Sequence, residues 1–208
     1  KILIKKDNTF FYYKIPFIGV YNIYNFMAAF ATISHIFNIK LFSFNNLKKP
    51  DGRFTVIENN IIIDYAHTPN ALENLLLTIK HIYKNKDIIL VMGSQGGKDK
   101  SKRWILGRVA DKYCTNIILT SEDPKNENLL GIIFDISLGI INNHYTIEFS
   151  RKNAIKKAIN LKDENKIILI VGKGLETKEN INNIIYPHSD YNCVIDNIKR
   201  LSYLTAFF

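Results

Sequence analysis

The spacing of apolar and polar residues predicts a small structural unit at the start of the chain. Residues 2–4 and 10–15 alternate between apolar and polar positions, which is the period of a strand. Residues 22–37 form a strongly apolar segment that is long enough for a helix. The stretch 45–53 is polar and carries a proline and a glycine, so we expect a linker or a domain boundary there.

Beyond that boundary, apolar segments of two kinds follow one another. Short runs rich in Ile, Leu and Val alternate with longer segments in which apolar residues recur at helical spacing. We expect strands at 54–64, 88–92, 116–121, 145–149 and 166–171, and helices at 69–84, 102–113, 128–141, 152–160 and 190–202. Such alternation predicts an α/β fold with a doubly wound, mostly parallel sheet, in which ligands bind beyond the carboxyl ends of the strands.

The composition is that of a folded globular protein. The 208 residues are 47% hydrophobic and 23% charged, and the length suits one sizeable domain or one domain with part of another. The formal net charge is +9, but the lysines are scattered and form neither a block nor a stripe. We therefore interpret the charge as ordinary surface charge and expect no nucleic-acid partner.

Cysteines and apolar runs narrow the class of protein further. The two cysteines, Cys114 and Cys193, are far apart and belong to no C-x-x-C pattern, which indicates neither a disulfide framework nor a zinc site. The first residues lack the continuous apolar segment of a secretory signal, and no run approaches the length of a membrane span. We expect a cytoplasmic protein that does not enter a membrane.

The stretch VMGSQGGKDKSKR, residues 91–103, looks at first like a phosphate-binding loop. A Walker loop needs four residues between its first glycine and the Gly-Lys-Ser/Thr. Here only three residues separate Gly93 from Gly97, and Asp99 occupies the position of the hydroxyl residue, where a carboxylate would repel phosphate. The spacing of a dinucleotide fingerprint is absent as well. A strand, a glycine-rich turn and a helix remain, either as a ligand loop or as a plain connection.

Four stretches that follow predicted strands carry more polar groups than a connection needs. They are DYAHTPN at 64–70, GSQGGKDKSKR at 93–103, TSEDPKNE at 120–127 and GKGLE at 172–176. The carboxyl ends of parallel strands share one edge of a sheet, so we expect these stretches to surround one crevice. Each stretch alone would be an ordinary loop.

Five residues are candidates for a nucleotide site. Asp64 at a strand end can accept two ribose hydroxyls and His67 can approach a phosphate, although both could equally serve a surface turn. Asn22 and Asn25 lie on one face of a helix start, where paired amides suit either a purine edge or a helix cap. Arg53 can stack on a base or can be a surface arginine.

The other polar stretches favour a zwitterionic ligand. TSEDPKNE places Glu122 and Lys125 on either side of a proline turn, and mixed charge suits an amine and a carboxylate together. In GKGLE, Gly172 allows close backbone approach and Glu176 can hold an ammonium group. The alternative for both stretches is a loop whose charges are simply solvated.

Six short motifs follow one another along the chain: NIYN, DGR, DYAHTPN, GGKDKSKR, EDPKNE and GKGLE. Together they resemble the Mur ligase family, most closely its UDP-N-acetylmuramoyl-tripeptide synthetase branch, whose pattern runs N-x-x-N, G-R, D-Y-A-H-T-P, G-G-x-R-D-K-x-K-R, D-N-P-R-x-E and G-K-G-H-E. The resemblance covers nearly the whole chain, and D-Y-A-H-T-P is its most specific part. It implies a Rossmann-like C-terminal domain at 50–208, preceded at 1–49 by the tail of a central ATP-binding domain.

The resemblance also implies roles for individual residues. The nucleotide-facing set comprises Asn22 and Asn25 at the adenine, Arg53 against the nucleotide, Asp64 at the ribose hydroxyls and His67 near the phosphates. The set that contacts the incoming amino acid comprises Lys98, Glu122, Lys125, Gly172 and Glu176. No residue is assigned to the chemical step with certainty, and none as a metal ligand.

The reaction that the resemblance implies is an ATP-dependent ligation in peptidoglycan precursor synthesis. The substrate would be UDP-N-acetylmuramoyl-L-alanyl-D-glutamate, which is called UDP-MurNAc-dipeptide for short. The amino acid added would be meso-diaminopimelate or L-lysine. ATP with Mg²⁺ would convert the peptide carboxylate to an acyl phosphate, which the amine then attacks in a closed, water-free site. The alternatives are a related ligase, such as folylpolyglutamate or cyanophycin synthetase, and a truncated binding remnant without catalysis.

The chain also departs from the family pattern. These 208 residues contain no Walker loop, no Mg²⁺-binding Glu or His of the central domain and no UDP-sugar domain. We therefore expect no ATP hydrolysis by the isolated chain, and a separate N-terminal Mur ligase polypeptide is one way to complete it. Lys98 and Lys125 stand where the family has arginine, which keeps the charge but loses the bidentate fork. Glu122 replaces an aspartate and Leu175 a histidine.

Overall fold

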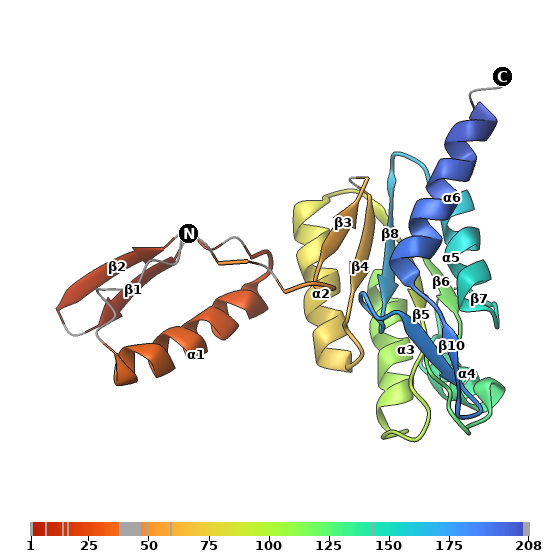
Figure 1. Ribbon diagram of the computed structural model, residues 1–208, viewed down its shortest axis with the longest axis horizontal. Helices are drawn as coiled ribbons and strands as arrows, with labels where there is room; N and C mark the ends of the chain where they lie inside the picture. The colour runs from red at the N-terminus through yellow and green to blue at the C-terminus, as the bar shows by residue number, and fades with distance from the viewer. Residues whose placement is uncertain are drawn as a thin grey trace. The chain divides into compact units, whose positions relative to one another are not determined.

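The computed structural model divides the chain into two compact units, Lys1–Pro50 and Asp51–Phe208 (Figure 1). Each unit is described by itself. The residues described are 2–6, 8–13, 15, 17–37, 47–48, 50–58, 60–142 and 144–205. None of the helices in these ranges is both long enough and apolar enough to cross a membrane.

The first unit is a hairpin with one helix. Strands β1 (Ile2–Lys6) and β2 (Thr9–Tyr13) pair antiparallel, and helix α1 (Val20–Ile36) follows after Gly19, whose φ of 95° suits glycine. Tyr13 packs against two phenylalanines of α1, with ring centroids 5.7 Å from Phe26 and 5.5 Å from Phe30. The two strands and the helix predicted for this part of the chain are confirmed, with small differences at their ends.

The second unit contains a six-stranded sheet with the order β3-β4-β8-β5-β6-β7. Five of these strands are parallel neighbours, and only β3 pairs antiparallel, with β4 at one edge. The prediction of a doubly wound, mostly parallel α/β sheet is therefore confirmed. The strands are β3 (Thr55–Ile57), β4 (Ile61–Asp64), β5 (Asp87–Met92), β6 (Asn116–Leu119), β7 (Tyr145–Ile147) and β8 (Lys166–Val171).

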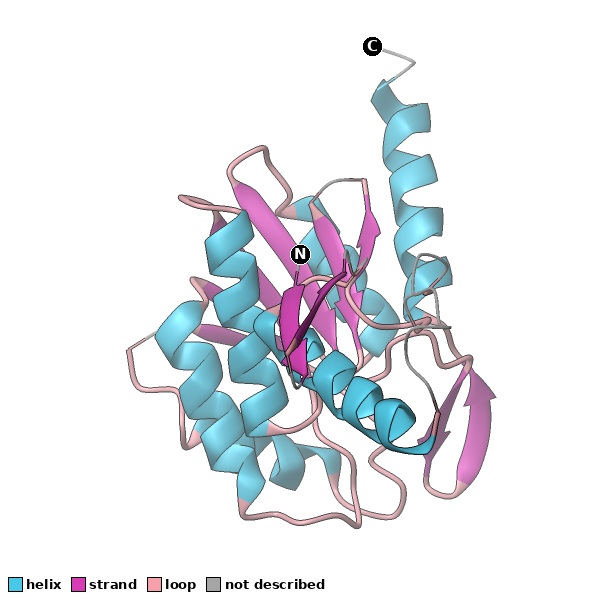
Figure 2. Ribbon diagram, turned by 90° about the vertical axis from the view of Figure 1, so that its left-hand side faces the viewer, coloured by secondary structure: helices cyan, strands magenta, loops and turns pink. Residues whose placement is uncertain are grey.

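Helices cover both faces of this sheet, as Figures 1 and 2 show. The strands alternate strictly: Leu90 of β5 belongs to the core that contains α2, α3 and α4, and its neighbours Ile89 and Val91 belong to the core that contains α5 and α6. Both sets of side chains are buried, which explains why the strands read as continuous apolar runs. The helices are α2 (Pro69–Ile82), α3 (Lys102–Tyr113), α4 (Leu129–Ser137), α5 (Arg151–Asn160) and α6 (Asp190–Thr205).

Two predictions of secondary structure were incorrect. The single strand expected at 54–64 is the antiparallel pair β3 and β4, because Glu58 adopts a φ of 48° and reverses the chain. The hairpin of β9 (Lys178–Ile181) and β10 (Ile184–Pro187) was not predicted. Its turn residues Asn182 and Asn183 have φ values of 52° and 60°, as the two central residues of a tight hairpin turn require.

Candidate functional site

The loops that follow β4, β5, β6 and β8 meet at the carboxyl edge of the sheet. Glycines allow the contacts: a Cβ added at Gly93 would lie 2.8 Å from the Cβ of Glu122, and one added at Gly174 would lie 3.3 Å from the ring of Tyr65. A Cβ at Gly172 would collide with the Glu122 carboxylate. The polar ends of the four strands therefore form one continuous surface within the second unit.

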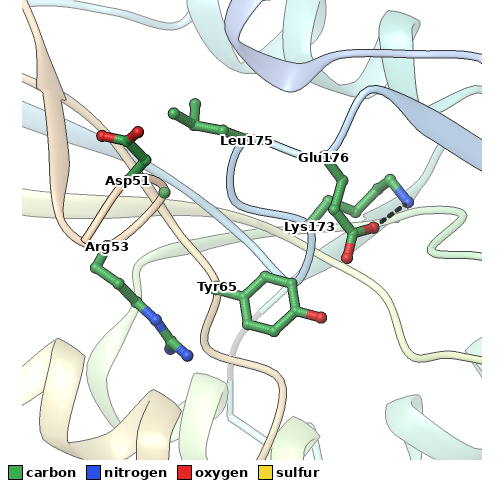
Figure 3. Close-up of a pocket in the computed structure, with 7 residues that line it drawn as sticks. Asp51, Arg53, Tyr65, Lys173, Leu175 and Glu176 are labelled. Atoms are coloured by element: carbon green, nitrogen blue, oxygen red, sulfur yellow. Dashed lines mark hydrogen bonds and ion pairs between the residues drawn. The ribbon is translucent and has the colours of Figure 1, made fainter.

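A pocket of about 380 Å³ opens on this surface. Figure 3 shows its lining, which mixes acidic and basic side chains from the turn before β3 and the loops after β4 and β8: Asp51, Gly52, Arg53, Tyr65, Lys173, Leu175 and Glu176. The Arg53 guanidinium lies 5.0 Å from the centre of the Tyr65 ring, and burial, followed by the Glu176 carboxylate, raises the pKa of Tyr65. A pocket with both signs of charge suits a ligand that carries both.

Asp64 fixes the loop that carries Arg53. Its carboxylate is almost completely buried, and it accepts hydrogen bonds from the backbone N–H of Phe54 at 2.7 Å and of Ala66 at 2.8 Å. Phe54 has a φ of 46°, so the bond holds a backbone conformation that non-glycine residues seldom adopt. The ribose-binding role of Asp64 stays a prediction, and the visible role is to hold Arg53 beside Tyr65.

His67 lies in the loop between β4 and α2. Its Nδ1 is 2.9 Å from the carbonyl oxygen of Tyr65, and its own carbonyl accepts a hydrogen bond of 3.1 Å from Lys102 Nζ. The Tyr65 and His67 rings lie edge to face with centroids 5.0 Å apart. Thr68 then caps α2 by accepting from the Ala71 N–H. The ring of His67 is thereby held near Arg53 through Tyr65.

Lys98 lies exposed in the glycine-rich loop after β5. The shape of this loop is fixed by an ion pair between Arg103 and Glu127, which was not predicted from the sequence. Arg103 is completely buried and donates to both carboxylate oxygens of Glu127, at 2.7 and 2.8 Å. Glu127 also accepts from the Gly97 N–H at 3.1 Å and pairs with Lys100 at 2.9 Å. The hydrogen bond from Arg103 holds the pKa of Glu127 far below its usual range. The Glu127 carboxylate therefore stays ionised.

Glu122 is a buried carboxylate at the end of β6. Only 1% of its surface is exposed, and among the residues that the structure describes its Oε1 has no hydrogen-bond partner. Burial raises the pKa of Glu122 to about 7, although Arg151 and Lys173 oppose the shift. A carboxylate in this state can gain or lose a proton near neutral pH and can bind a donor that reaches it.

Lys173 joins the loop after β6 to the loop after β8, and Figure 3 shows its contact with Glu176. Its side chain is fully buried, and Nζ donates to Asp123 Oδ1 and Oδ2, both at 2.9 Å, and to Glu176 Oε2 at 3.1 Å. The predicted ligand residue Glu176 is therefore held by a lysine that was not singled out in the sequence. A sequence feature that could have identified Lys173 is its position between the two glycines of GKGLE.

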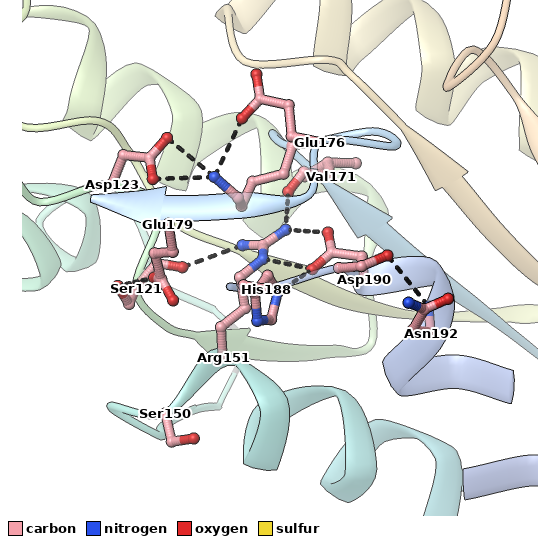
Figure 4. Close-up of polar contacts among 12 residues, drawn as sticks. Ser121, Asp123, Ser150, Arg151, Val171, Glu176, Glu179, His188, Asp190 and Asn192 are labelled. Carbon is pink, nitrogen blue, oxygen red and sulfur yellow. Dashed lines mark hydrogen bonds and ion pairs between the residues drawn. The ribbon is translucent and has the colours of Figure 1, made fainter. Parts of the chain in front are cut away.

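Arg151 lies beneath the same loops and ties two strand ends together. Its guanidinium donates to the carbonyl of Ser121, after β6, at 3.1 Å and to the carbonyl of Val171, at the end of β8, at 2.7 Å. Figure 4 shows it at the centre of this network. Carbonyls at the ends of parallel strands need donors when they are buried, and Arg151 supplies them from the start of α5.

The predicted residues thus fall into four groups. Arg53 and Glu176 line the pocket. A second group lies at the strand ends and in the loops around it: Asp64, His67, Glu122, Lys125 and Gly172. Lys98 lies exposed in the glycine-rich loop. Asn22 and Asn25 lie in the first unit, at the start of α1, where Asn22 Nδ2 donates to the Ile18 carbonyl at 2.6 Å and Asn25 Nδ2 to Asn22 Oδ1 at 3.5 Å.

Metal binding was tested against the side chains present. Within the described ranges, no three His, Cys, Asp or Glu side chains are grouped so that they could hold a metal ion. Asp123 and Glu176 are instead engaged with Lys173, Glu127 with Arg103 and Asp64 with backbone N–H groups. We assign no metal ligand among the residues that the structure describes.

Comparison with known proteins gives a consistent result. Residues 52–174 match the family model described as Mur ligase, glutamate ligase domain. The chain is 36% identical over 205 residues to the UDP-N-acetylmuramoyl-L-alanyl-D-glutamate–2,6-diaminopimelate ligase of Alkaliphilus oremlandii, covering 94% of this chain and 41% of that protein. It is 44% identical over 147 residues to the ligase of the same name from Aquifex aeolicus, covering 69% and 30%. The chain therefore spans well under half the length of these curated relatives.

Solved structures agree. A structure of a UDP-N-acetylmuramoyl-L-alanyl-D-glutamate–2,6-diaminopimelate ligase superposes with a TM-score of 0.70 at 27% identity, covering 94% of this chain and 42% of that one. The folylpolyglutamate synthase of Mycobacterium tuberculosis superposes with a TM-score of 0.62 at 18% identity, covering 76% and 38%, and this second likeness concerns the fold alone.

Proposed function

The chain belongs to the Mur ligase family, and from that premise we propose that it supplies the amino-acid-binding part of an ATP-dependent ligase. The proposed reaction adds meso-diaminopimelate or L-lysine to UDP-N-acetylmuramoyl-L-alanyl-D-glutamate in peptidoglycan precursor synthesis. Residues 50–208 would be the C-terminal domain and residues 1–49 the tail of the central ATP-binding domain. The division of the chain after Pro50 into two compact units supports these limits.

One observation carries the proposal. The loops after β6 and β8, which hold Glu122, Lys125 and Glu176, are joined through Lys173 beside a pocket of mixed charge. A free amino acid needs a carboxylate for its ammonium group and a cation for its own carboxylate. Glu176 lines the pocket and would hold the ammonium group, while Lys98 and Lys125 would offer positive charge to the carboxylate.

The nucleotide would bind at the turn before β3 and at the loop after β4. Arg53 is exposed, lines the pocket and is kept in place by Tyr65 and, through Phe54, by Asp64. A guanidinium fixed in this way can pair with a phosphate or lie against a base. By the family resemblance, Asn22 and Asn25 would contact the adenine, Asp64 the ribose hydroxyls, and His67 would lie near the phosphates.

The reaction makes simple demands on these residues. A carboxylate oxygen of the dipeptide attacks the γ-phosphorus of ATP and ADP leaves; the amine of the amino acid then attacks the acyl carbon, inorganic phosphate leaves and the new amide nitrogen loses a proton. The residues of this chain would orient the amine and exclude water from the acyl phosphate. Mg²⁺ would offset phosphate charge, and no residue described in this chain is assigned to hold it.

The proposal is tested by calorimetry with the two candidate amino acids, and by phosphate release from the complete polypeptide that carries these 208 residues. We expect saturable binding of meso-diaminopimelate or L-lysine, and phosphate release that requires ATP, the UDP-linked dipeptide and that amino acid together. Glu176→Gln should weaken binding of the amino acid. Glu164→Gln, an exposed control after α5, should leave that binding unchanged. Absence of amino-acid binding and of amino-acid-dependent phosphate release would contradict the proposal.

A further inference from the structure

Asp123 contacts three other segments at the carboxyl edge of the sheet. Its Oδ1 accepts hydrogen bonds from Lys173 Nζ at 2.9 Å and from the Asn180 N–H at 2.7 Å, and its Oδ2 accepts from Lys173 Nζ at 2.9 Å. Its carbonyl oxygen accepts from the Gly96 N–H at 3.0 Å. One residue thus joins its own loop to the glycine-rich loop, to the loop after β8 and to strand β9.

These bonds hold an unusual backbone. Asp123 and Lys125, on either side of Pro124, have φ values of 45° and 53°, in the left-handed region that non-glycine residues seldom adopt. Such a conformation persists only where its surroundings enforce it. The two carboxylate oxygens of Asp123 supply part of that enforcement.

The hairpin β9–β10 also holds the backbone of this turn. The Lys125 N–H donates to the Asn180 carbonyl at 3.1 Å, and the Asn182 N–H donates to the Lys125 carbonyl at 2.7 Å. The Ser121 hydroxyl donates to the Glu179 carboxylate. The loop therefore runs beside β9 like a short extra strand, with Lys125 fixed at both its backbone groups.

The ion pair between Lys173 and Asp123 is sheltered from solvent, since the lysine side chain is 0% exposed and the aspartate side chain 13%. The same ammonium group also holds Glu176 on the pocket wall. Lys125 and Glu176 are therefore connected through Asp123 and Lys173, and the geometry of one depends on the other. A shielded charge pair of this kind orients its neighbours more firmly than an exposed pair would.

We propose that Asp123 is a positioning residue of the amino-acid site, which sets the placement of the turn that carries Lys125 relative to Glu176. The inference rests on the proposed function. Asp123 itself need not touch the amino acid, because its carboxylate is already engaged with Lys173 and Asn180. The hairpin β9–β10 then serves as the support against which this turn is held.

The test compares Asp123→Ala and Asp123→Asn with Asp163→Ala. Asp163 is a matched control: it also accepts from a backbone N–H, that of Asn165, and pairs with a lysine, Lys166, but in the turn between α5 and β8, at the opposite ends of the strands. Amide hydrogen exchange is measured at Lys125 and Asn182 in this chain. The KM values for the amino acid and for ATP, and kcat, are measured in the complete polypeptide.

We expect Asp123→Ala to speed exchange at both amides and to raise the KM for the amino acid roughly tenfold or more, with the KM for ATP changed less than about twofold. Asp123→Asn keeps an acceptor for the Asn180 N–H and should raise the same KM by a smaller factor, about threefold. This second variant decides the matter if the alanine variant does not fold. Asp163→Ala should change neither readout.

The outcomes separate the two proposals. An active protein whose amino-acid KM stays within about twofold of wild type in both Asp123 variants would overturn the inference alone. A rise in both KM values together would overturn it too, because it would indicate general damage rather than positioning. A wild-type protein without amino-acid-dependent activity would overturn the proposed function, and this inference with it.

Discussion

Arg151 and Asp190 form an ion pair from which solvent is completely excluded. Arg151 Nε donates to Asp190 Oδ1 at 2.8 Å and Nη2 donates to Oδ2 at 2.7 Å, and both side chains are 0% exposed. His188 Nε2 lies 2.7 Å from the same Oδ1. Burial opposes the charge on Asp190, but Arg151 outweighs it and holds the pKa of Asp190 below its usual range. The pair fastens the start of α6 to the start of α5.

We predict that Asp190→Asn destabilises the fold by about 3–5 kcal/mol, because it leaves a buried guanidinium without its counter-charge. Urea unfolding at neutral pH measures the effect. The more exposed pair of Asp163 and Lys166 is the comparison, and Asp163→Ala should cost much less, because solvent screens the pair. Equal losses in the two variants would contradict the claim that burial makes the Arg151 pair important.

The buried carboxylate of Glu122 makes a second prediction, on pH. Its pKa is raised to about 7 in the folded protein, above the ordinary value of about 4.3. Between these values the folded state binds more protons than the unfolded state, so this group makes the free energy of unfolding fall as pH rises. The penalty is small below about pH 4 and nearly complete at about pH 8, where it is on the order of 3–4 kcal/mol.

Glu122→Gln removes this ionisation while keeping the shape of the side chain. The variant should lie within about 0.5 kcal/mol of the wild type in urea unfolding at about pH 4 and exceed it by about 3–4 kcal/mol at about pH 8. Glu164→Gln, in the turn between α5 and β8, is an exposed control. If the gap between wild type and Glu122→Gln did not widen with pH, the carboxylate would not be titrating in this range.

Much of the fold could be predicted because continuous runs of apolar residues mark the buried strands in the sequence. In β5 and β8 nearly every residue is buried on one face or the other, so both strands read as continuous apolar runs between polar turns. The hairpin β9–β10 carried a weaker signal, since its second strand, from Ile184, is exposed throughout and only the adjacent Asn182 and Asn183 marked the turn.

The anchoring cations of the site could not be predicted, for a different reason. Arg151 pairs with Asp190 and Lys173 with Asp123, 39 and 50 residues away along the chain. A single sequence shows that an arginine or a lysine is present but not which distant carboxylate it meets. The candidates Arg53 and Glu176 were singled out from their residue types and short motifs, and the family resemblance then implied their roles, whereas the groups that hold them emerged only from the fold.

Gly172 offers a third prediction, on packing. Its φ is 106°, and an added Cβ would collide with the Glu122 carboxylate. Gly172→Ala should therefore cost about 2 kcal/mol or more in the free energy of unfolding. Gly131 in α4 is the matched control, since nothing lies within 4 Å of its added Cβ, and Gly131→Ala should stabilise the protein by about 0.5 kcal/mol.

The double variant Gly172→Ala with Glu122→Ala separates the two causes. Shortening residue 122 removes the collision but leaves the backbone strain at φ 106°, so part of the loss caused by Gly172→Ala should be recovered and part should remain. Full additivity of the two single losses would show that the Glu122 side chain does not fill the space beside Gly172.

Lys98 carries the last prediction, on the amino-acid site. Its side chain is exposed in a loop whose shape depends on Arg103 and Glu127, so Lys98→Ala should change the free energy of unfolding by less than about 0.5 kcal/mol. In the proposed function Lys98 meets the carboxylate of the amino acid. Losing a charge-assisted hydrogen bond worth about 1.5–3 kcal/mol should then raise the KM for that amino acid roughly tenfold or more.

Lys98→Arg is the informative counterpart, because a guanidinium can bind a carboxylate through two parallel hydrogen bonds whereas an ammonium acts as a point charge. We expect it to lower the KM for the amino acid by a factor of about three to ten, with the KM for ATP unchanged. Lys84→Ala, exposed after α2 at the opposite edge of the sheet, should have no effect. If Lys98→Ala left the amino-acid KM as it was, the glycine-rich loop would not contact the ligand, and its conformation would serve only to connect β5 to α3.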